Sequence, residues 1–181
     1  MGYHILMPFG SEKNKNKILS NLRRFDVTLH PIIDSSVKFP KLNWIQLFNF
    51  TSSGNNLSSI YYNALNKFME KVKISDKDYY MFLSDTDYLE PSFFKKLKEI
   101  NTDFIVVSLK RKNDRPFISS WRNMGRQGMS GKQLIVRGKY LKEEGFGGAQ
   151  VASVKFASKL WKKYPHGDFT FAPNAYIWAT S

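Results

Sequence analysis

Two aspartates separated by one residue, Asp85 and Asp87, are the side chains whose types and spacing best fit chemistry. They follow the apolar run at residues 79–83, which is typical of a strand buried on both faces of a parallel sheet. Such a strand would present both carboxylates at the carboxyl edge of the sheet, where open α/β sheets bind ligands. Because neighbouring carboxylates repel each other, a divalent cation with oxygen ligands is their usual partner. The pair therefore predicts metal-assisted chemistry on a phosphate ligand.

A structural role for the same pair is the alternative. Asp85 and Asp87 could instead cap the helix that is predicted to begin near Pro91. The metal interpretation is favoured because Asp85 directly follows an apolar strand, where two unpaired buried carboxylates would be costlier than a bound cation.

A basic stretch at residues 110–132 could supply positive charge to a phosphate ligand. Its cationic candidates are Arg111, Lys112, Arg115, Arg122, Arg126 and Lys132. Arginine binds phosphate through two parallel hydrogen bonds, and glycines at positions 125, 128 and 131 would let a loop close over a ligand. A solvated loop is the alternative, and the spacing does not match a Walker A motif.

Other polar side chains give weaker signals. Asp34 follows the strand predicted at residues 26–33, where it could accept hydrogen bonds from a base or a ribose, and an Asx turn is the alternative. The histidines, His4, His30 and His166, are isolated in the sequence. No pair of them has the spacing of a metal site, so none is a leading candidate for a ligand.

The pattern of apolar residues predicts one α/β domain over residues 1–181. Strands are expected at residues 4–9, 26–33, 44–50, 79–83, 104–109, 133–136, 169–172 and 175–178, and helices at 17–25, 57–72, 151–163 and from Pro91 onwards. The early alternation of strands and helices indicates a mainly parallel central sheet flanked by helices. Pro31 predicts that the second strand is an edge strand or ends irregularly.

Composition narrows the class of protein. The 181 residues are 42% hydrophobic and 15% aromatic, which allows a sizeable core and argues against a disordered chain. Cysteine is absent, which excludes disulfides, thiol catalysis and Cys-ligated zinc. There is no apolar stretch of membrane-spanning length and no signal peptide, so a cytoplasmic protein is expected. The net charge of +13 favours polyanionic partners, and peripheral contact with an anionic membrane is one such expectation.

Taken in order, the segments of this chain resemble glycosyltransferases of the GT-A fold, most closely those of family 2. The Asp85-Thr86-Asp87 segment, followed by Pro-Ser-Phe-Phe at residues 91–94, is similar to the DxD motif and its helix. Further segments resemble the first strand, the base-contacting acid, the helix before the metal strand and the late strand, and they lie at residues 5–9, 33–36, 63–66 and 167–175. The likeness covers nearly the whole chain, and the ordered set makes it more specific than a lone DxD.

The resemblance implies a GT-A (nucleotide-diphospho-sugar transferase) fold. It also implies transfer of a sugar from a UDP-, GDP- or dTDP-sugar to a glycan or lipid-linked acceptor. Mn²⁺ or Mg²⁺, held by Asp85 and Asp87, would bridge the diphosphate and stabilise the leaving nucleotide. Asp87 is the first choice for direct metal ligation. The residues expected to contact the nucleotide are Pro8, Phe9, Asp34, Asp85 and Thr86.

The catalytic base is where the chain departs most from the family pattern. Gln150 falls where the base of inverting members belongs, and an amide cannot accept a proton in that role. Glu144 is therefore the predicted base, with Glu143 and Asp168 as other acids nearby. Trp178 lies close to the place of a metal-supporting histidine, so that support is also in question.

Two other functions remain open at this stage. A basic, non-catalytic module that binds nucleic acid or an anionic glycan would explain the net charge of +13. A nucleotidyltransferase would use the same carboxylates at the sheet edge for phosphoryl transfer. Nucleic acid is not expected as a partner of the glycosyltransferase itself.

Overall fold

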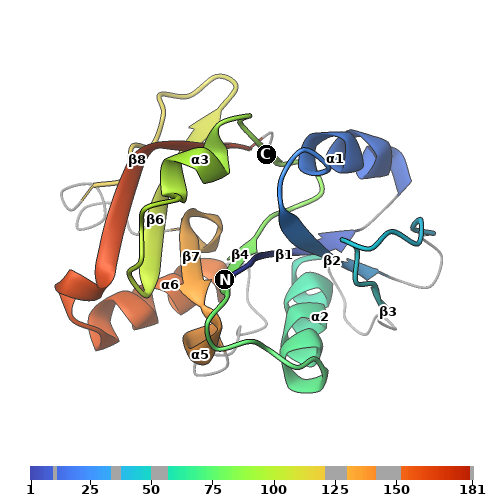
Figure 1. Cartoon of the computed structure of the whole chain (residues 1–181), viewed down its shortest axis with the longest axis horizontal. Coiled ribbons are helices and arrows are strands. Elements are labelled where there is room, and N and C mark those ends of the chain that lie inside the picture. Colours follow the sequence, from blue (N-terminus) through green and yellow to red (C-terminus); the bar gives the residue numbers. More distant parts are fainter. Residues whose placement is uncertain (10–11, 34–37, 50–56, 121–129, 142–151, 180–181) are drawn as a thin grey trace.

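The computed structural model describes residues 1–9, 12–33, 38–49, 57–120, 130–141 and 152–179. They form an eight-stranded sheet in the order β3-β2-β1-β4-β7-β6-β8-β5, with helices on both faces (Figure 1). The strands are β1 (Tyr3–Phe9), β2 (Val27–Ile33), β3 (Phe48–Asn49), β4 (Tyr79–Phe82), β5 (Tyr88–Leu89), β6 (Phe104–Arg111), β7 (Leu134–Arg137) and β8 (Phe169–Ala179). The helices are α1 (Lys15–Leu22), α2 (Leu57–Lys71), α3 (Phe93–Leu97), α5 (Gly138–Leu141) and α6 (Ala152–Lys163), with 3₁₀ turns η1 (Glu12–Asn14), η2 (Gly131–Gln133) and η3 (His166–Asp168).

The central strands consist largely of apolar residues because both faces of the sheet are covered. In β1, Ile5 and Met7 belong to the core cluster that contains Ile18 of α1. Leu6, which points to the opposite face, belongs to the cluster that contains Phe68 of α2. A strand buried on both faces reads as a continuous apolar run, which is why the sequence reveals these strands clearly.

The sheet is parallel in its first half and mixed in its second. β3, β2, β1 and β4 are parallel neighbours, whereas β7 runs antiparallel to both β4 and β6. β8 is parallel to β6 and antiparallel to β5. The predicted α/β sheet flanked by helices is confirmed, and four of these seven pairings are parallel.

The prediction of an edge position for the second strand is wrong. β2 lies between β1 and β3, and its Pro31 sits opposite Met7 of β1. On the other side the pairing is interrupted, since Leu29 forms an isolated bridge with Ile45 and regular pairing with β3 resumes only at Ile32. Proline lacks an N–H. Because the pairing on this side is interrupted at Pro31, the sheet loses no hydrogen bond there.

The late region forms one strand where the sequence predicts two. β8 continues through Pro173 because the strand bulges there: its register on β6 shifts between Val107 and Ser108. The Ser108 hydroxyl donates to the Pro173 carbonyl at 2.8 Å and satisfies it at the bulge. The break that proline signals is therefore a local bend within a continuous strand.

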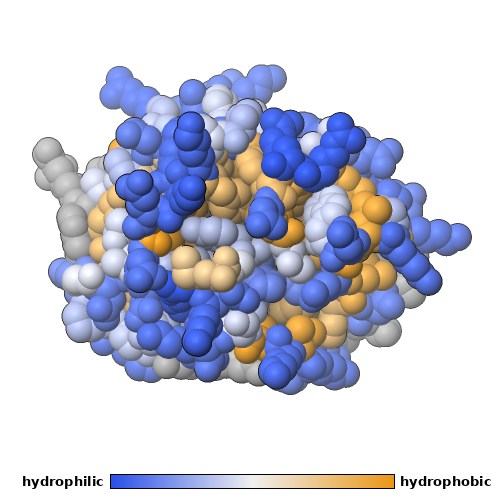
Figure 2. Space-filling model, viewed as in Figure 1, coloured by the Kyte–Doolittle hydropathy of each residue, from blue (hydrophilic) through white to orange (hydrophobic). Residues whose placement is uncertain are grey.

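Figure 2 shows one face covered mostly by hydrophilic residues, with hydrophobic patches between them. In the described part of the chain, the well-exposed large hydrophobic side chains are Met1, Leu42 and Leu47. None of the described helices has the length and apolar character needed to cross a membrane.

Candidate functional site

Asp85 and Asp87 lie in the turn that follows β4. β1 runs parallel beside β4, and their pairing extends to Leu6 and Phe82. Since parallel neighbours end at the same edge of a sheet, the turn lies beside the carboxyl end of β1, at the edge where open α/β sheets bind ligands.

The other predicted nucleotide contacts are placed only in part. Pro8 and Phe9 end β1 at this edge, but both side chains are buried. The Phe9 ring packs against Phe39, with ring centroids 4.8 Å apart. Contact between these residues and a nucleotide stays a prediction. So do the roles of Asp34 and Glu144, which lie outside the described residues.

The second aspartate closes the turn and does not face solvent. Asp87 has no exposed surface. Its Oδ2 accepts the Ser84 N–H at 2.8 Å, and its own N–H donates to the Ser84 carbonyl at 3.0 Å. Asp85 and Thr86 are partly exposed, and the Thr86 hydroxyl lies 3.2 Å from that of Ser84. Asp87 therefore shapes the turn, while Asp85 and Thr86 are the members of the motif that reach solvent.

Lys132 neutralises Asp87. Its Nζ lies 2.9 Å from Asp87 Oδ2 and 3.1 Å from Oδ1, and it donates to the Ser84 hydroxyl at 3.1 Å. Strand direction explains the contact: β7 is antiparallel to β4, with Tyr80 opposite Val136, and the same register continued places Lys132 opposite Ser84. Because β7 is antiparallel to β4, it begins at the edge where β4 ends. The residues just before β7 therefore lie beside the acidic turn, and Lys132 is one of them.

A capping box fixes where β7 begins. The Ser130 side chain accepts the Lys132 N–H at 3.4 Å, and the Gln133 side chain accepts the Ser130 N–H at 3.3 Å. The buried Gln133 amide also donates to the Val107 carbonyl at 3.1 Å. These bonds hold the segment before β7 against β6, which orients Lys132 toward Asp87.

The donor set at Asp87 does not fit a resident divalent cation. Mn²⁺ and Mg²⁺ take several oxygen ligands at about 2.0–2.2 Å. The oxygens of Asp87 already accept hydrogen bonds from Ser84 and Lys132. Across the ranges that the structure describes, no three His, Asp or Glu side chains group into a set that could hold a metal ion. Asp85, which is partly exposed, is the member of the pair that an incoming cation could reach.

An aromatic pair borders the acidic turn and was not predicted. Tyr88 directly follows Asp87 and stacks on Trp178 of β8, with ring centroids 5.7 Å apart and planes inclined by 6°. The Lys110 ammonium lies 4.2 Å from the centroid of the Trp178 ring. The pairing of Tyr88 with Trp178 between β5 and β8 accounts for the stack. Trp178 thus lies close to the motif, as the resemblance implies for that position, but as a stacking partner.

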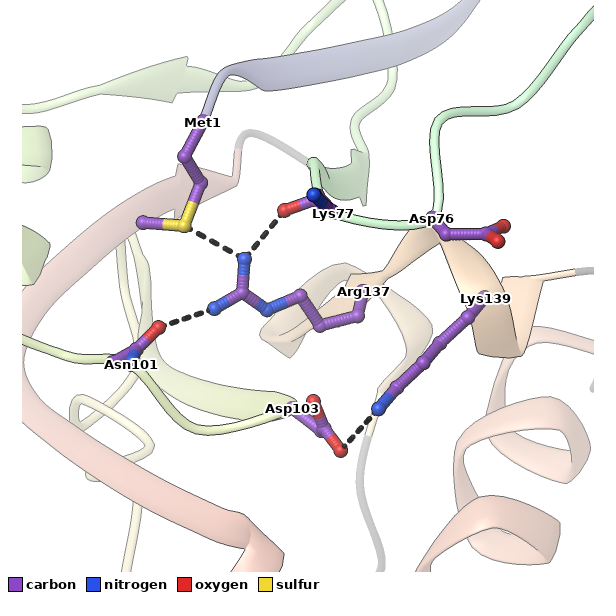
Figure 3. A pocket seen from close by; sticks show the side chains of 7 residues that line it. All are labelled: Met1, Asp76, Lys77, Asn101, Asp103, Arg137 and Lys139. Carbon is purple, nitrogen blue, oxygen red and sulfur yellow. Dashed lines mark hydrogen bonds and ion pairs between the residues drawn. The ribbon is translucent and has the colours of Figure 1, made fainter.

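A cavity of about 540 Å³ lies at the opposite edge of the sheet (Figure 3). Arg137, at the end of β7, donates there to the Lys77 carbonyl and to the side chain of Asn101. Lys139 pairs with Asp103 at 3.0 Å. Arg137 and Lys139 are paired within the protein, and this cavity lies at the amino ends of β1 and β4, away from the edge where open α/β sheets bind ligands. The candidate site is the edge that carries Asp85.

Two histidines that are far apart in the sequence, His4 and His30, are neighbours in the structure. Nδ1 of His4, in β1, and Nε2 of His30, in β2, lie 2.8 Å apart. His4 Nε2 lies 3.2 Å from Asp78 Oδ2, and the His4 ring stacks on Tyr80. His30 is buried, and within the described residues its Nδ1 has no hydrogen-bond partner. Burial, and to a lesser extent the neighbouring His4, lowers the pKa of His30 to about 3.

Stability is expected to fall as the solution becomes acidic. The unfolded chain takes up a proton at His30 below about pH 6.5, whereas the folded chain does so only near its depressed pKa. The free energy of unfolding should therefore drop by about 1.4 kcal/mol per pH unit below about pH 6.5. Urea unfolding at a series of pH values measures this slope. His30→Gln should reduce it, and the control His166→Gln, at an exposed site, should leave it; equal slopes in all three proteins would contradict the assignment.

Comparison with known proteins shows the fold. No family model and no curated protein matches this sequence. The solved structure of Staphylococcus aureus TarS 1–349, a glycosyltransferase, is similar with a TM-score of 0.70 and 16% identity. The match covers 99% of this chain and 60% of that one, so the chain spans less than two thirds of the TarS structure.

A second similar structure is 4-diphosphocytidyl-2C-methyl-D-erythritol synthase, a nucleotidyltransferase. Its TM-score is 0.53 at 14% identity, and the match covers 89% of this chain and 86% of that one. At such identities the likeness concerns the fold alone. The two structures confirm the predicted GT-A-type fold, which glycosyltransferases and nucleotidyltransferases share.

Proposed function

We propose that this protein is a glycosyltransferase that takes its sugar from a nucleotide-diphosphate donor. The observation that carries the proposal is the Asp85-Thr86-Asp87 turn, held at the ligand-binding edge of the sheet with the Lys132 ammonium against its second acid. Acidic and cationic groups together can orient a ribose and a diphosphate, because each binds a different part of the donor. The similarity of the fold to TarS supports glycosyl transfer.

Each residue has a distinct role in this proposal. The nucleotide lies along the ends of β1 and β4, where Asp85 accepts a ribose hydroxyl or helps hold a cation. Transfer breaks the bond between the anomeric carbon of the sugar and the phosphate oxygen, through an oxocarbenium-like transition state. The acceptor hydroxyl, on a glycan or a lipid-linked saccharide, attacks that carbon and gives its proton to a base, for which Glu144 is the candidate.

A divalent cation remains part of the proposal at Asp85. Bound Mn²⁺ or Mg²⁺ would add positive charge beside the leaving diphosphate. We place it at Asp85 in this proposal, because Asp87 already accepts hydrogen bonds from Ser84 and Lys132. Metal dependence is therefore tested by comparing donor binding in Mn²⁺ with donor binding in EDTA.

A thermal-shift experiment with UDP-, GDP- and dTDP-sugars, each with Mn²⁺ and with EDTA, tests the proposed function. A donor at about 100 times its Kd stabilises the folded protein by about 2.7 kcal/mol, which raises Tm by several degrees in a domain of this size. One class of nucleotide is expected to produce a shift that grows with its concentration. No shift with any donor, in either condition, would contradict the proposal.

Nucleotidyl transfer is the second candidate, because the synthase of similar structure is a nucleotidyltransferase. Product analysis separates the two: a glycosyltransferase releases the nucleoside diphosphate, whereas a nucleotidyltransferase releases pyrophosphate from a nucleoside triphosphate. The dependence of binding on salt concentration distinguishes the remaining alternative, a basic binding module, from both enzymes. Such a module requires affinity for nucleic acid or anionic glycan that falls steeply with ionic strength and shows no nucleotide-sugar specificity.

A further inference from the structure

We propose that Lys132 is the site's own phosphate-binding cation, so that the donor diphosphate is held without a metal at Asp87. This inference rests on the proposed function and makes it more specific. It follows from the partner of the buried acid, from the exposure of the ammonium and from the place where β7 begins.

The first argument is the occupancy of Asp87. Its carboxylate has no exposed surface and accepts hydrogen bonds from the Ser84 N–H at 2.8 Å and from Lys132 at 3.1 Å, and the ammonium lies 2.9 Å from its second oxygen. A metal ion would have to displace the ammonium from both oxygens. Lys132 would then lie beside the ion as a like charge in a buried place, which is unfavourable. The ammonium already provides the charge that a buried aspartate requires.

The second argument is reach. An ammonium has three N–H donors. Two of those of Lys132 go to Asp87 Oδ1 and to the Ser84 hydroxyl, at 3.1 Å each, and Asp87 Oδ2 lies 2.9 Å away as an ion-pair partner. The Lys132 side chain remains 25% exposed, whereas that of Asp87 is fully buried. The pair therefore presents its positive partner to the solution. Asp87 and Ser84 hold that ammonium in place, so little of its conformational freedom is lost when a phosphate binds.

The third argument is position. Lys132 lies in η2, just before β7, and the register of β7 on β4, if continued, places it opposite Ser84, just after β4, at the same edge as the carboxyl end of β1. A diphosphate bound at this edge beside Asp85 would lie next to the ammonium. Charge-assisted hydrogen bonds to phosphate are about twice as strong as neutral ones, so the contact is expected to dominate affinity for the diphosphate part of the donor.

The test is calorimetric binding of UDP, GDP and dTDP, compared with the corresponding nucleosides, in EDTA and in Mn²⁺. The wild-type protein is expected to bind one diphosphate in EDTA. Lys132→Met should weaken that binding about tenfold or more and leave nucleoside binding unchanged, whereas Lys132→Arg should retain most of it. The matched control is Lys139→Met, which removes a lysine paired with Asp103 at the other edge of the sheet and should bind as wild type does.

A double variant distinguishes a loss of phosphate binding from a folding defect. Lys132→Met leaves Asp87 buried without its cation, so Asp87→Asn is combined with it to remove both charges. The double variant should fold, bind the nucleoside and still bind the diphosphate weakly.

Three outcomes would overturn the inference. Diphosphate binding that requires Mn²⁺, or that survives Lys132→Met unchanged, would overturn the inference and leave the proposed function standing. Failure of every diphosphate to bind, with and without Mn²⁺, would overturn the inference and the proposed function together.

Discussion

Asp87→Ala is expected to lower stability and to weaken nucleotide-sugar binding strongly. The change leaves the Ser84 N–H without its acceptor and the Lys132 ammonium without its counter-ion at a buried place. Lys132 is partly exposed and can turn to solvent, so we expect a loss of about 2–4 kcal/mol and not the larger cost of a fully buried unpaired charge. Urea unfolding measures the stability, and a thermal shift with the donor measures binding.

Two companion variants assign the cause. Asp87→Asn keeps an oxygen that can accept the Ser84 N–H, so it should recover part of the stability and lose the charge pair. Asp103→Ala removes the acid of the Lys139 pair at the opposite edge and should leave donor binding intact. An Asp87→Ala protein with wild-type stability and donor affinity would contradict the structural role and the proposed site together.

Gly138→Ala is expected to be among the most destabilising single substitutions in the described chain. A Cβ at this position would lie 2.0 Å from the Ser75 carbonyl oxygen and 2.9 Å from Ile74 Cγ2. The neighbouring backbone cannot yield easily, because the Gly138 N–H donates to the Asp78 carbonyl at 2.9 Å. Overpacking against backbone should cost about 3 kcal/mol or more. Thermal unfolding and soluble yield measure the effect.

Gly167→Ala is the matched control for that substitution. A Cβ on Gly167 would meet no atom within 4 Å. Its stability is therefore expected to stay within about 0.5 kcal/mol of wild type. Equal stability of the two variants would show that the loop at Ser75 adapts to the added methyl group.

The order of elements can be predicted from the sequence because the central strands are buried on both faces. The continuous apolar run of β4 and the helical spacing of Ala64, Leu65 and Phe68 are local signals, and the structure confirms both elements. The direction of β7 has no such signal. Its four buried residues, Leu134–Arg137, would have the same pattern in a parallel strand, and direction depends on how the chain returns to the sheet.

The candidate site could be predicted only where its residues are close in the sequence. Asp85 and Asp87 follow directly from the strand before them. The ion pair of Asp87 with Lys132 spans 45 residues and follows from the direction of β7, so the sequence shows Lys132 only as one cation in a basic stretch. The contact of His4 with His30 depends on the register of β1 against β2. The position of each histidine in a predicted strand was the available signal.

Lys132 lies in η2, immediately before β7, so a shift of one residue in the register of β7 on β4 would move it away from Ser84 and Asp87. The capping box and the Gln133 bond to Val107 oppose such a slip. An insertion or deletion between Ser130 and Leu134 would therefore remove the lysine from its place, whereas a single codon change could exchange it and leave the backbone as it is. Among related sequences, the residue at position 132 should therefore vary by substitution, whereas the number of residues between Ser130 and Leu134 should stay constant.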